Sequence, residues 1–153
     1  MAIRPLRFEG DPVLLEIAAP AAVFDDALAT LVRDMFETMY AATGRGLAAP
    51  QIGESARVFV VDMQWKEHEP DPMIFVNPQI TAHAEAETTG QEACLSIRGK
   101  SFDVSRPVWV ELTWQDLDGA VHQGRFDGPL GVCICHELDH LDGLLITQTG
   151  TPR

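Results

Sequence analysis

The segment His136-Glu137-Leu138-Asp139-His140 constrains the fold of this chain more than any other stretch. On an α-helix, residues four positions apart lie on one face, with their Cβ atoms about 5–6 Å apart. His136 and His140 can therefore reach one metal ion. Glu137 stands near the same face, where its carboxylate can take a proton from a water molecule. This spacing indicates a metal-dependent hydrolase.

The residues around this segment are largely apolar, which favours a buried helix over a solvated helix face with two ordinary histidines. They are Val132, Ile134, Leu138, Leu141, Leu144 and Leu145. Buried polar groups need partners, and a metal is the simplest partner for two buried imidazoles. We therefore expect a helix over residues 131–140 that carries a metal site.

Length, composition and charge limit the remaining possibilities. The chain has 153 residues, 46% of them hydrophobic, which suffices for one domain over residues 1–147. Residues 148–153 are expected to form a short polar tail. The net charge of −12 argues against direct nucleic-acid binding. No stretch suits a membrane span, and three cysteines without a secretory signal favour the reducing cytoplasm.

Hydrophobic periodicity predicts an α+β fold with mainly antiparallel sheets of short strands. An amphipathic N-terminal helix is expected over residues 24–42, and strands over 57–62, 73–76, 108–115 and 120–126. Asp118-Gly119 is a hairpin signal between the last two strands. Residues 80–88 alternate only weakly. We expect the sheets to pack around the central C-terminal helix that carries the two histidines.

A catalytic site of this kind usually has three protein ligands and one open position. The candidates for the third ligand are Cys94, Cys133, Cys135, His68, His83, His122 and the acidic residues. Cys133 shares the helical face of His136, whereas Cys135 is rotated away, and both are most simply small buried hydrophobes. Cys94 lies in a predicted loop between strand candidates. Core packing and metal ligation explain Cys94 equally well when it is taken alone.

Residues 44–53, Gly-Arg-Gly-Leu-Ala-Ala-Pro-Gln-Ile-Gly, form another unusual segment. Gly44 and Gly46 permit a close backbone approach that a Cβ atom would block. Gln51 carries an amide that can donate a hydrogen bond to an oxyanion. Taken alone, the segment is better explained as a plain connection between a helix and a strand.

Three motifs follow one another along the chain: Gly-x-Gly-Leu-Ala-Ala-Pro-Gln at 44–51, Glu-x-Cys-Leu-Ser at 92–96 and His-Glu-x-x-His at 136–140. This ordered set resembles the peptide deformylase family, and the resemblance covers nearly the whole chain. It implies an enzyme that removes the N-formyl group from the N-terminal methionine of newly made polypeptides and releases formate. A deformylase-like hydrolase with a shifted substrate preference is the alternative. A zinc metallopeptidase fits less well, because Cys94 and the 44–51 motif argue against it. A non-catalytic metal-binding paralogue also fits less well, because a structural site needs no base such as Glu137.

The resemblance also implies roles for individual residues. The implied metal ligands are Cys94, His136 and His140. The implied general base is Glu137, and the implied oxyanion hole consists of Gln51 and the backbone N–H of Leu95. The metal would be Fe²⁺ in the cell, with Zn²⁺, Ni²⁺ or Co²⁺ able to occupy the site of a purified sample.

The substrate site would be formed by Gly44, Arg45 and Gly46, with Gly46 pairing with the substrate backbone. Val132 and Cys133 are our candidates for the wall of an apolar methionine pocket. N-formylmethionyl nascent peptides are the expected partners, with no nucleic acid or membrane. The resemblance is compatible with proximity to the ribosome, but the sequence stops without the long C-terminal helix of many relatives, which argues against docking there.

Several residues depart from the pattern of the family. Arg45 replaces an aliphatic residue, and its stem is expected to pack while its head reaches water, rather than to bind an acidic group or block entry. Ala93 replaces a glycine, which is tolerable where φ is negative. Arg98 stands in place of a proline and Cys135 in place of a glutamine. No departure removes a ligand, the base or the oxyanion amide.

Overall fold

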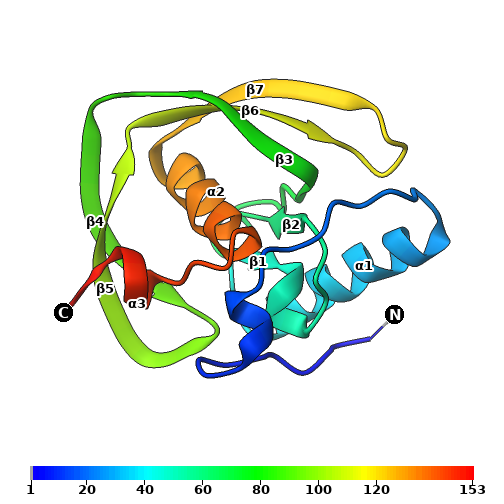
Figure 1. Ribbon diagram of the computed structural model, residues 1–153, viewed down its shortest axis with the longest axis horizontal. Coiled ribbons are helices and arrows are strands. Elements are labelled where there is room, and N and C mark those ends of the chain that lie inside the picture. Colours follow the sequence, from blue (N-terminus) through cyan, green and yellow to red (C-terminus); the bar gives the residue numbers. More distant parts are fainter. Residues whose placement is uncertain (1) are drawn as a thin grey trace.

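Helix α2 (Gly128–Leu141) carries both histidines through the middle of the molecule in the computed structural model, which describes residues 2–153 (Figure 1). Pro129 occupies its first turn, where the missing N–H costs no intrahelical hydrogen bond. Gly143, with φ of 76°, turns the chain after the helix. The predicted helix over residues 131–140 is confirmed, with one turn added at its start.

A five-stranded antiparallel sheet covers one side of α2 in the order β1-β2-β3-β6-β7. Its strands are β1 (Gly46–Ala48), β2 (Val58–Val61), β3 (Met73–His83), β6 (Trp109–Gln115) and β7 (Val121–Asp127). The predicted hairpin between β6 and β7 is confirmed, and Gly119 adopts φ of 83° in its turn. Strand β3 is longer than its sequence pattern indicates, because shifts of register near Asn77 and Ile80 let it continue past Pro78.

A second antiparallel sheet lies apart from the first, on the left of Figure 1, in the order β4-β5-β8. Its strands are β4 (Glu87–Cys94), β5 (Ile97–Pro107) and β8 (Thr151–Pro152). The sequence did not predict these strands, since most of β4 is polar and exposed. The expectation that Cys94 lies in a loop is wrong. Cys94 is the last residue of β4 and pairs with Ile97. Part of the polar 148–153 segment forms β8, paired with β5.

The helices fill the space beside and between the sheets. The predicted N-terminal amphipathic helix is α1 (Asp26–Ala41), which Asp25 caps by accepting a hydrogen bond from the backbone N–H of Leu28. Short helical turns occur at η1 (Pro12–Leu15), η2 (Ala49–Ile52) and α3 (Ile146–Thr149). None of the helices within residues 2–153 is long and apolar enough to cross a membrane.

Three groups of buried side chains hold these layers together. The group beneath α2 includes Ile134, Leu138 and Leu141, which pack against Phe59 and Phe75 of the five-stranded sheet. The second joins α1 to the outer side of β1 and β2. The third lies under the three-stranded sheet and includes Cys94. This arrangement places the end of β4 against the side of α2, where the two histidines lie.

Candidate metal centre

Cys94, His136 and His140 meet at one point of the structure, and one ligand atom from each lies within 4.8 Å of the other two. Strand β4 supplies the thiol and helix α2 supplies both imidazoles. The distance between Cys94 Sγ and His140 Nε2 is 3.4 Å. Within residues 2–153 this is the one group of three such ligands, so His68, His83 and His122 do not join it.

The ring of His136 is oriented by a carboxylate that sequence reasoning did not assign. Nδ1 of His136 lies 3.0 Å from Oε1 of Glu92, so Nδ1 carries the proton and Nε2 is left for the metal position. Burial opposes protonation of His136, but its hydrogen bonds with Cys94 and Glu92 outweigh burial and raise its pKa to about 10. The negative partners of His136 therefore stabilise positive charge at this ring, and a bound cation would supply that charge in place of the second proton.

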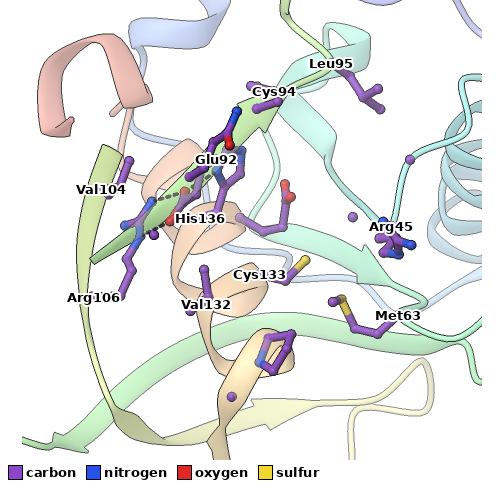
Figure 2. A pocket seen from close by; sticks show the side chains of 18 of the residues that line it. Arg45, Met63, Glu92, Cys94, Leu95, Val104, Arg106, Val132, Cys133 and His136 are labelled. Atoms are coloured by element: carbon purple, nitrogen blue, oxygen red, sulfur yellow. Dashed lines mark hydrogen bonds and ion pairs between the residues drawn. The ribbon is translucent and has the colours of Figure 1, made fainter. Parts of the chain in front are cut away.

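A buried arginine holds the carboxylate of Glu92 in turn. Arg106 of β5 donates from Nε and Nη2 to the two oxygens of Glu92, over 3.0 and 2.9 Å, and Nη1 donates to Asp139 of α2. Burial disfavours the charged form of Glu92, but the hydrogen bonds from His136 and Arg106 outweigh burial and lower its pKa to about 2. Figure 2 shows this chain of contacts from Arg106 through Glu92 to His136.

His140 and Glu137 are buried, and each has a polar side-chain atom without a hydrogen-bond partner among the described residues: Nδ1 of His140 and Oε1 of Glu137. Burial lowers the pKa of His140, which keeps the imidazole neutral as a metal ligand must be. One thiol and two imidazoles are a donor set that suits iron, zinc, nickel or cobalt. The residues present therefore fit a single divalent metal ion.

Glu137 lies beside these three side chains, and its buried carboxyl group is suited to proton transfer. Burial raises the pKa of Glu137 to about 7, so the carboxyl group can both take and release a proton near neutrality. Gly46 of β1 makes room for it: a Cβ atom at residue 46 would come within 2.6 Å of Oε2 of Glu137 and 2.8 Å of Sγ of Cys133.

Gln51 is fully buried beside Cys94, where its amide is held in one orientation. Its Oε1 accepts a hydrogen bond from the backbone N–H of Ala48, so Nε2 points toward the metal centre. Nε2 lies 3.0 Å from Oγ of Ser96 and 3.7 Å from Sγ of Cys94. Leu95 follows Cys94 and lines the same cleft.

A cleft of about 910 Å³ leads from solvent to this centre (Figure 2). The residues expected to contact substrate all line it: Gly44, Arg45, Gly46, Val132 and Cys133. Met63 lies across from Cys133 and adds a second sulfur to an apolar part of the wall (Figure 2). Burial raises the pKa of Cys133 well above its ordinary value, which leaves its side chain a small apolar surface.

The structure accommodates the residues that depart from the family pattern. Ala93 is not among the residues with positive φ, so its methyl group causes no backbone strain. Arg98 stacks over the ring of Phe8 at 3.5 Å, and Cys135 is buried in the core under α2. The guanidinium of Arg45 is partly exposed to water, as expected, and it also donates a hydrogen bond from Nη2 to Oε1 of Glu67 over 2.7 Å.

This fold and donor set define the protein as a metal-dependent hydrolase: three ligands from β4 and α2, a neighbouring carboxyl group with a raised pKa and an open cleft meet at one site. The family model described as polypeptide deformylase matches residues 3–152. The chain belongs to the polypeptide deformylase family, and its activity is metal-dependent removal of the N-formyl group.

Known peptide deformylases are similar to this chain in sequence and structure over almost its whole length. The peptide deformylase of Zymomonas mobilis is 43% identical over 149 residues, which are 95% of this chain and 84% of that protein. The crystal structure of a peptide deformylase from Synechococcus elongatus in complex with actinonin has a TM-score of 0.91 at 39% identity, and covers 95% of this chain and 80% of that one. A Met-Ala-Ser-bound peptide deformylase from Acinetobacter baumannii has a TM-score of 0.89 at 29% identity, and covers 96% of this chain and 98% of that one.

Proposed function

We propose that this deformylase acts on N-formylmethionyl peptides in the cytoplasm, with Fe²⁺ as its metal and Glu137 as its general base. The observation that carries the proposal is the position of Glu137, a buried carboxyl group with an unpartnered oxygen beside three converging metal ligands. A purely structural metal site has no use for such a group. The Met-Ala-Ser ligand of the Acinetobacter baumannii relative supports a peptide that begins with methionine.

When bound, the divalent metal supplies Lewis-acid activation of a water molecule and of the formyl oxygen. Glu137 takes a proton from the water molecule while the oxygen of that water adds to the formyl carbon. The bond between that carbon and the methionine nitrogen then breaks, and Glu137 returns the proton to the nitrogen. Formate and a peptide with a free amino group leave the cleft, and Glu137 is ready for the next cycle.

Gln51 and Leu95 have positions suited to the negative charge that develops on the formyl oxygen. The amide of Gln51 is fixed by Ala48, so Nε2 can donate without losing entropy at the moment of reaction. Its present partner is Oγ of Ser96, a hydroxyl group that can rotate to accept or release this bond. We assign the second donor to the backbone N–H of Leu95.

The methionine side chain is assigned to the apolar wall formed by Val132, Cys133 and Met63. These side chains offer a hydrophobic surface with two polarisable sulfur atoms, which suits a thioether. The peptide backbone then lies along Gly46, whose lack of a side chain permits the close approach.

Formate release tests the proposal directly. Anaerobically purified protein loaded with Fe²⁺ is expected to release formate from formyl-Met-Ala-Ser and to leave acetyl-Met-Ala-Ser intact. The Glu137→Gln variant should keep its metal and lose about 10²–10⁴-fold in kcat, the range typical of general acid–base catalysis. Metal analysis of oxygen-protected protein identifies the native ion. Full activity of Glu137→Gln would refute its role, and a metal other than iron would refute that assignment.

A further inference from the structure

Arg45 is a partly exposed cation that lines the cleft, on a section of backbone that hydrogen bonds hold in place. Its carbonyl accepts a hydrogen bond from the backbone N–H of Asp62, and the carbonyl of Gly44 accepts one from Nε1 of Trp65. Strand β1 begins at the next residue and is the edge strand of its sheet. The guanidinium can therefore move while its backbone stays fixed at the cleft.

The charges of the cleft differ from those of the molecule as a whole. The chain has a net charge of −12, yet its cleft is lined by Arg45 and the exposed Lys66. The carboxylates that line it, Glu92 and Glu137, lie buried at its inner end, and Glu92 is already paired with Arg106. The solvent-accessible charged side chains that line the cleft, Arg45 and Lys66, are therefore both positive.

The partner that Arg45 has in this structure is readily exchanged. Glu67 is 57% exposed and Arg45 37% exposed, so their ion pair lies in water and contributes at most about 1 kcal/mol. Glu67 itself does not line the cleft. A carboxylate of a bound peptide could replace it and accept two parallel hydrogen bonds from the guanidinium.

The path of the peptide determines which residue reaches Arg45. Gly46 lies directly against Glu137 and Cys133, so a formyl group at Glu137 and a methionine side chain at Cys133 place the peptide start at Gly46. Arg45 directly precedes Gly46, the first residue of β1, and its side chain lines the cleft while 37% exposed. The residues that follow methionine therefore leave the cleft past Arg45.

We propose that Arg45 makes this enzyme selective for formylated peptides with an acidic side chain in the first two residues after methionine. The proposal rests on the proposed function and names its preferred substrates. Arg45 is here a specificity-determining residue that exchanges Glu67 for the carboxylate of the peptide. Bond breaking itself does not involve it.

The test compares C-terminally amidated peptides, because a free terminal carboxylate would also be attracted. Formyl-Met-Asp-Ala-amide is compared with formyl-Met-Asn-Ala-amide, and formyl-Met-Ala-Asp-amide with formyl-Met-Ala-Asn-amide. Each pair differs in charge and little in shape. In at least one pair, kcat/KM should favour Asp over Asn by about two- to fivefold, the range of an exposed ion pair, and added salt should reduce the ratio.

Variants assign the effect to the guanidinium. Arg45→Gln should bring the Asp/Asn ratio to about one, whereas Glu67→Gln, which removes the competing carboxylate, should raise it. Arg33→Gln is the matched control: Arg33 is exposed on α1, does not line the cleft, and its loss changes the net charge equally. That variant should keep the ratio of the wild type.

The outcomes separate this proposal from the one on which it rests. Turnover of the Asn peptides with Asp/Asn ratios of one or less in the wild type would overturn the selectivity and leave the deformylase function intact. A preference for Asp that survives in Arg45→Gln would overturn the role of Arg45. Absence of turnover with every formyl peptide, in metal-loaded protein, would overturn the proposed function and the selectivity with it.

Discussion

Glu92 lies two residues before Cys94 on strand β4 and bonds His136 of helix α2 over 3.0 Å between Oε1 and Nδ1. One strand therefore delivers a metal ligand and also the carboxylate that orients another. The thiol and the imidazole are fixed relative to each other by the same piece of backbone. Any displacement of β4 would alter both donors together.

Loss of the Glu92 carboxylate should weaken metal binding. In Glu92→Gln the side chain keeps its shape, but Nδ1 of His136 loses its charged acceptor. We expect the affinity for Zn²⁺ or Co²⁺ to fall about 10–100-fold, as is usual for such supporting contacts. Competition with a chromophoric chelator measures it. Glu87→Gln, an exposed position on the same strand, is the control and should keep the affinity of the wild type; equal affinities in both variants would count against this role.

Arg106 should matter for stability. Its guanidinium is buried and binds Glu92 and Asp139, so Arg106→Met leaves buried negative charge without compensation. We expect the free energy of unfolding of the metal-free protein to fall by about 3–5 kcal/mol, as found when one partner of a buried pair is removed. Urea denaturation measures it. Arg125→Met, which breaks the exposed pair with Glu111, should cost no more than about 1 kcal/mol. A similar loss in both variants would show that burial of Arg106 is unimportant.

An added methyl group at residue 46 should disturb the active site. In Gly46→Ala the new Cβ atom would lie 2.6 Å from Oε2 of Glu137, so the carboxyl group must move. Overpacking of this kind typically costs about 1–3 kcal/mol of stability. We expect kcat for formyl-Met-Ala-Ser to fall by at least about tenfold, because general-base catalysis depends on the position of the carboxyl group.

The control for Gly46→Ala is Gly124→Ala on β7. Its added Cβ atom would approach the far end of the Trp114 ring at 3.3 Å, away from the cleft. This variant should lose some stability and keep its turnover per folded molecule. Normal turnover of metal-loaded Gly46→Ala would count against Glu137 as the general base.

Tyr40 should make the fold sensitive to alkali. Burial, followed by the hydrogen bond from its hydroxyl group to Asp62, raises the pKa of Tyr40 above the ordinary value of about 10. Because the folded-state pKa is the higher one, the stabilisation is fully present below about pH 10 and is lost as the pH rises further. Stability should therefore fall more steeply above pH 10 in the wild type than in Tyr40→Phe.

The measurement for Tyr40 is direct because the chain has one tyrosine. Ultraviolet absorbance of tyrosinate follows its ionisation in the folded protein, and denaturant unfolding at several pH values follows stability. Ionisation of the folded protein at the ordinary pKa, together with equal slopes for wild type and Tyr40→Phe, would contradict the prediction.

The helix and the two histidines could be predicted because their signals are local. The spacing of His136 and His140 and the apolar residues around them lie within one segment. The ligand role of Cys94 needed the resemblance of three distant motifs, since no local pattern separates a ligand from a buried cysteine. The strand that ends at Cys94 escaped prediction because its residues are mostly polar and exposed.

The contacts among Glu92, Arg106 and Asp139 could not be predicted from spacing, because they come from two strands and a helix. One signal was nevertheless present in the sequence. Phe102, Val104 and Arg106 alternate along β5 and all three are buried. A cation on the apolar face of a strand requires a buried anion, and a search for its partner would have led to Glu92 or Asp139.

The ligands come from both halves of the fold: the thiol from the three-stranded sheet and the imidazoles from the helix packed on the five-stranded sheet. A cation bound there would therefore act as a cross-link between two layers that share no strand. Removal of the metal by a chelator should therefore loosen the contact between the two sheets. Hydrogen exchange of the backbone amides should then speed up more in β4 and β5 than in β2 and β3.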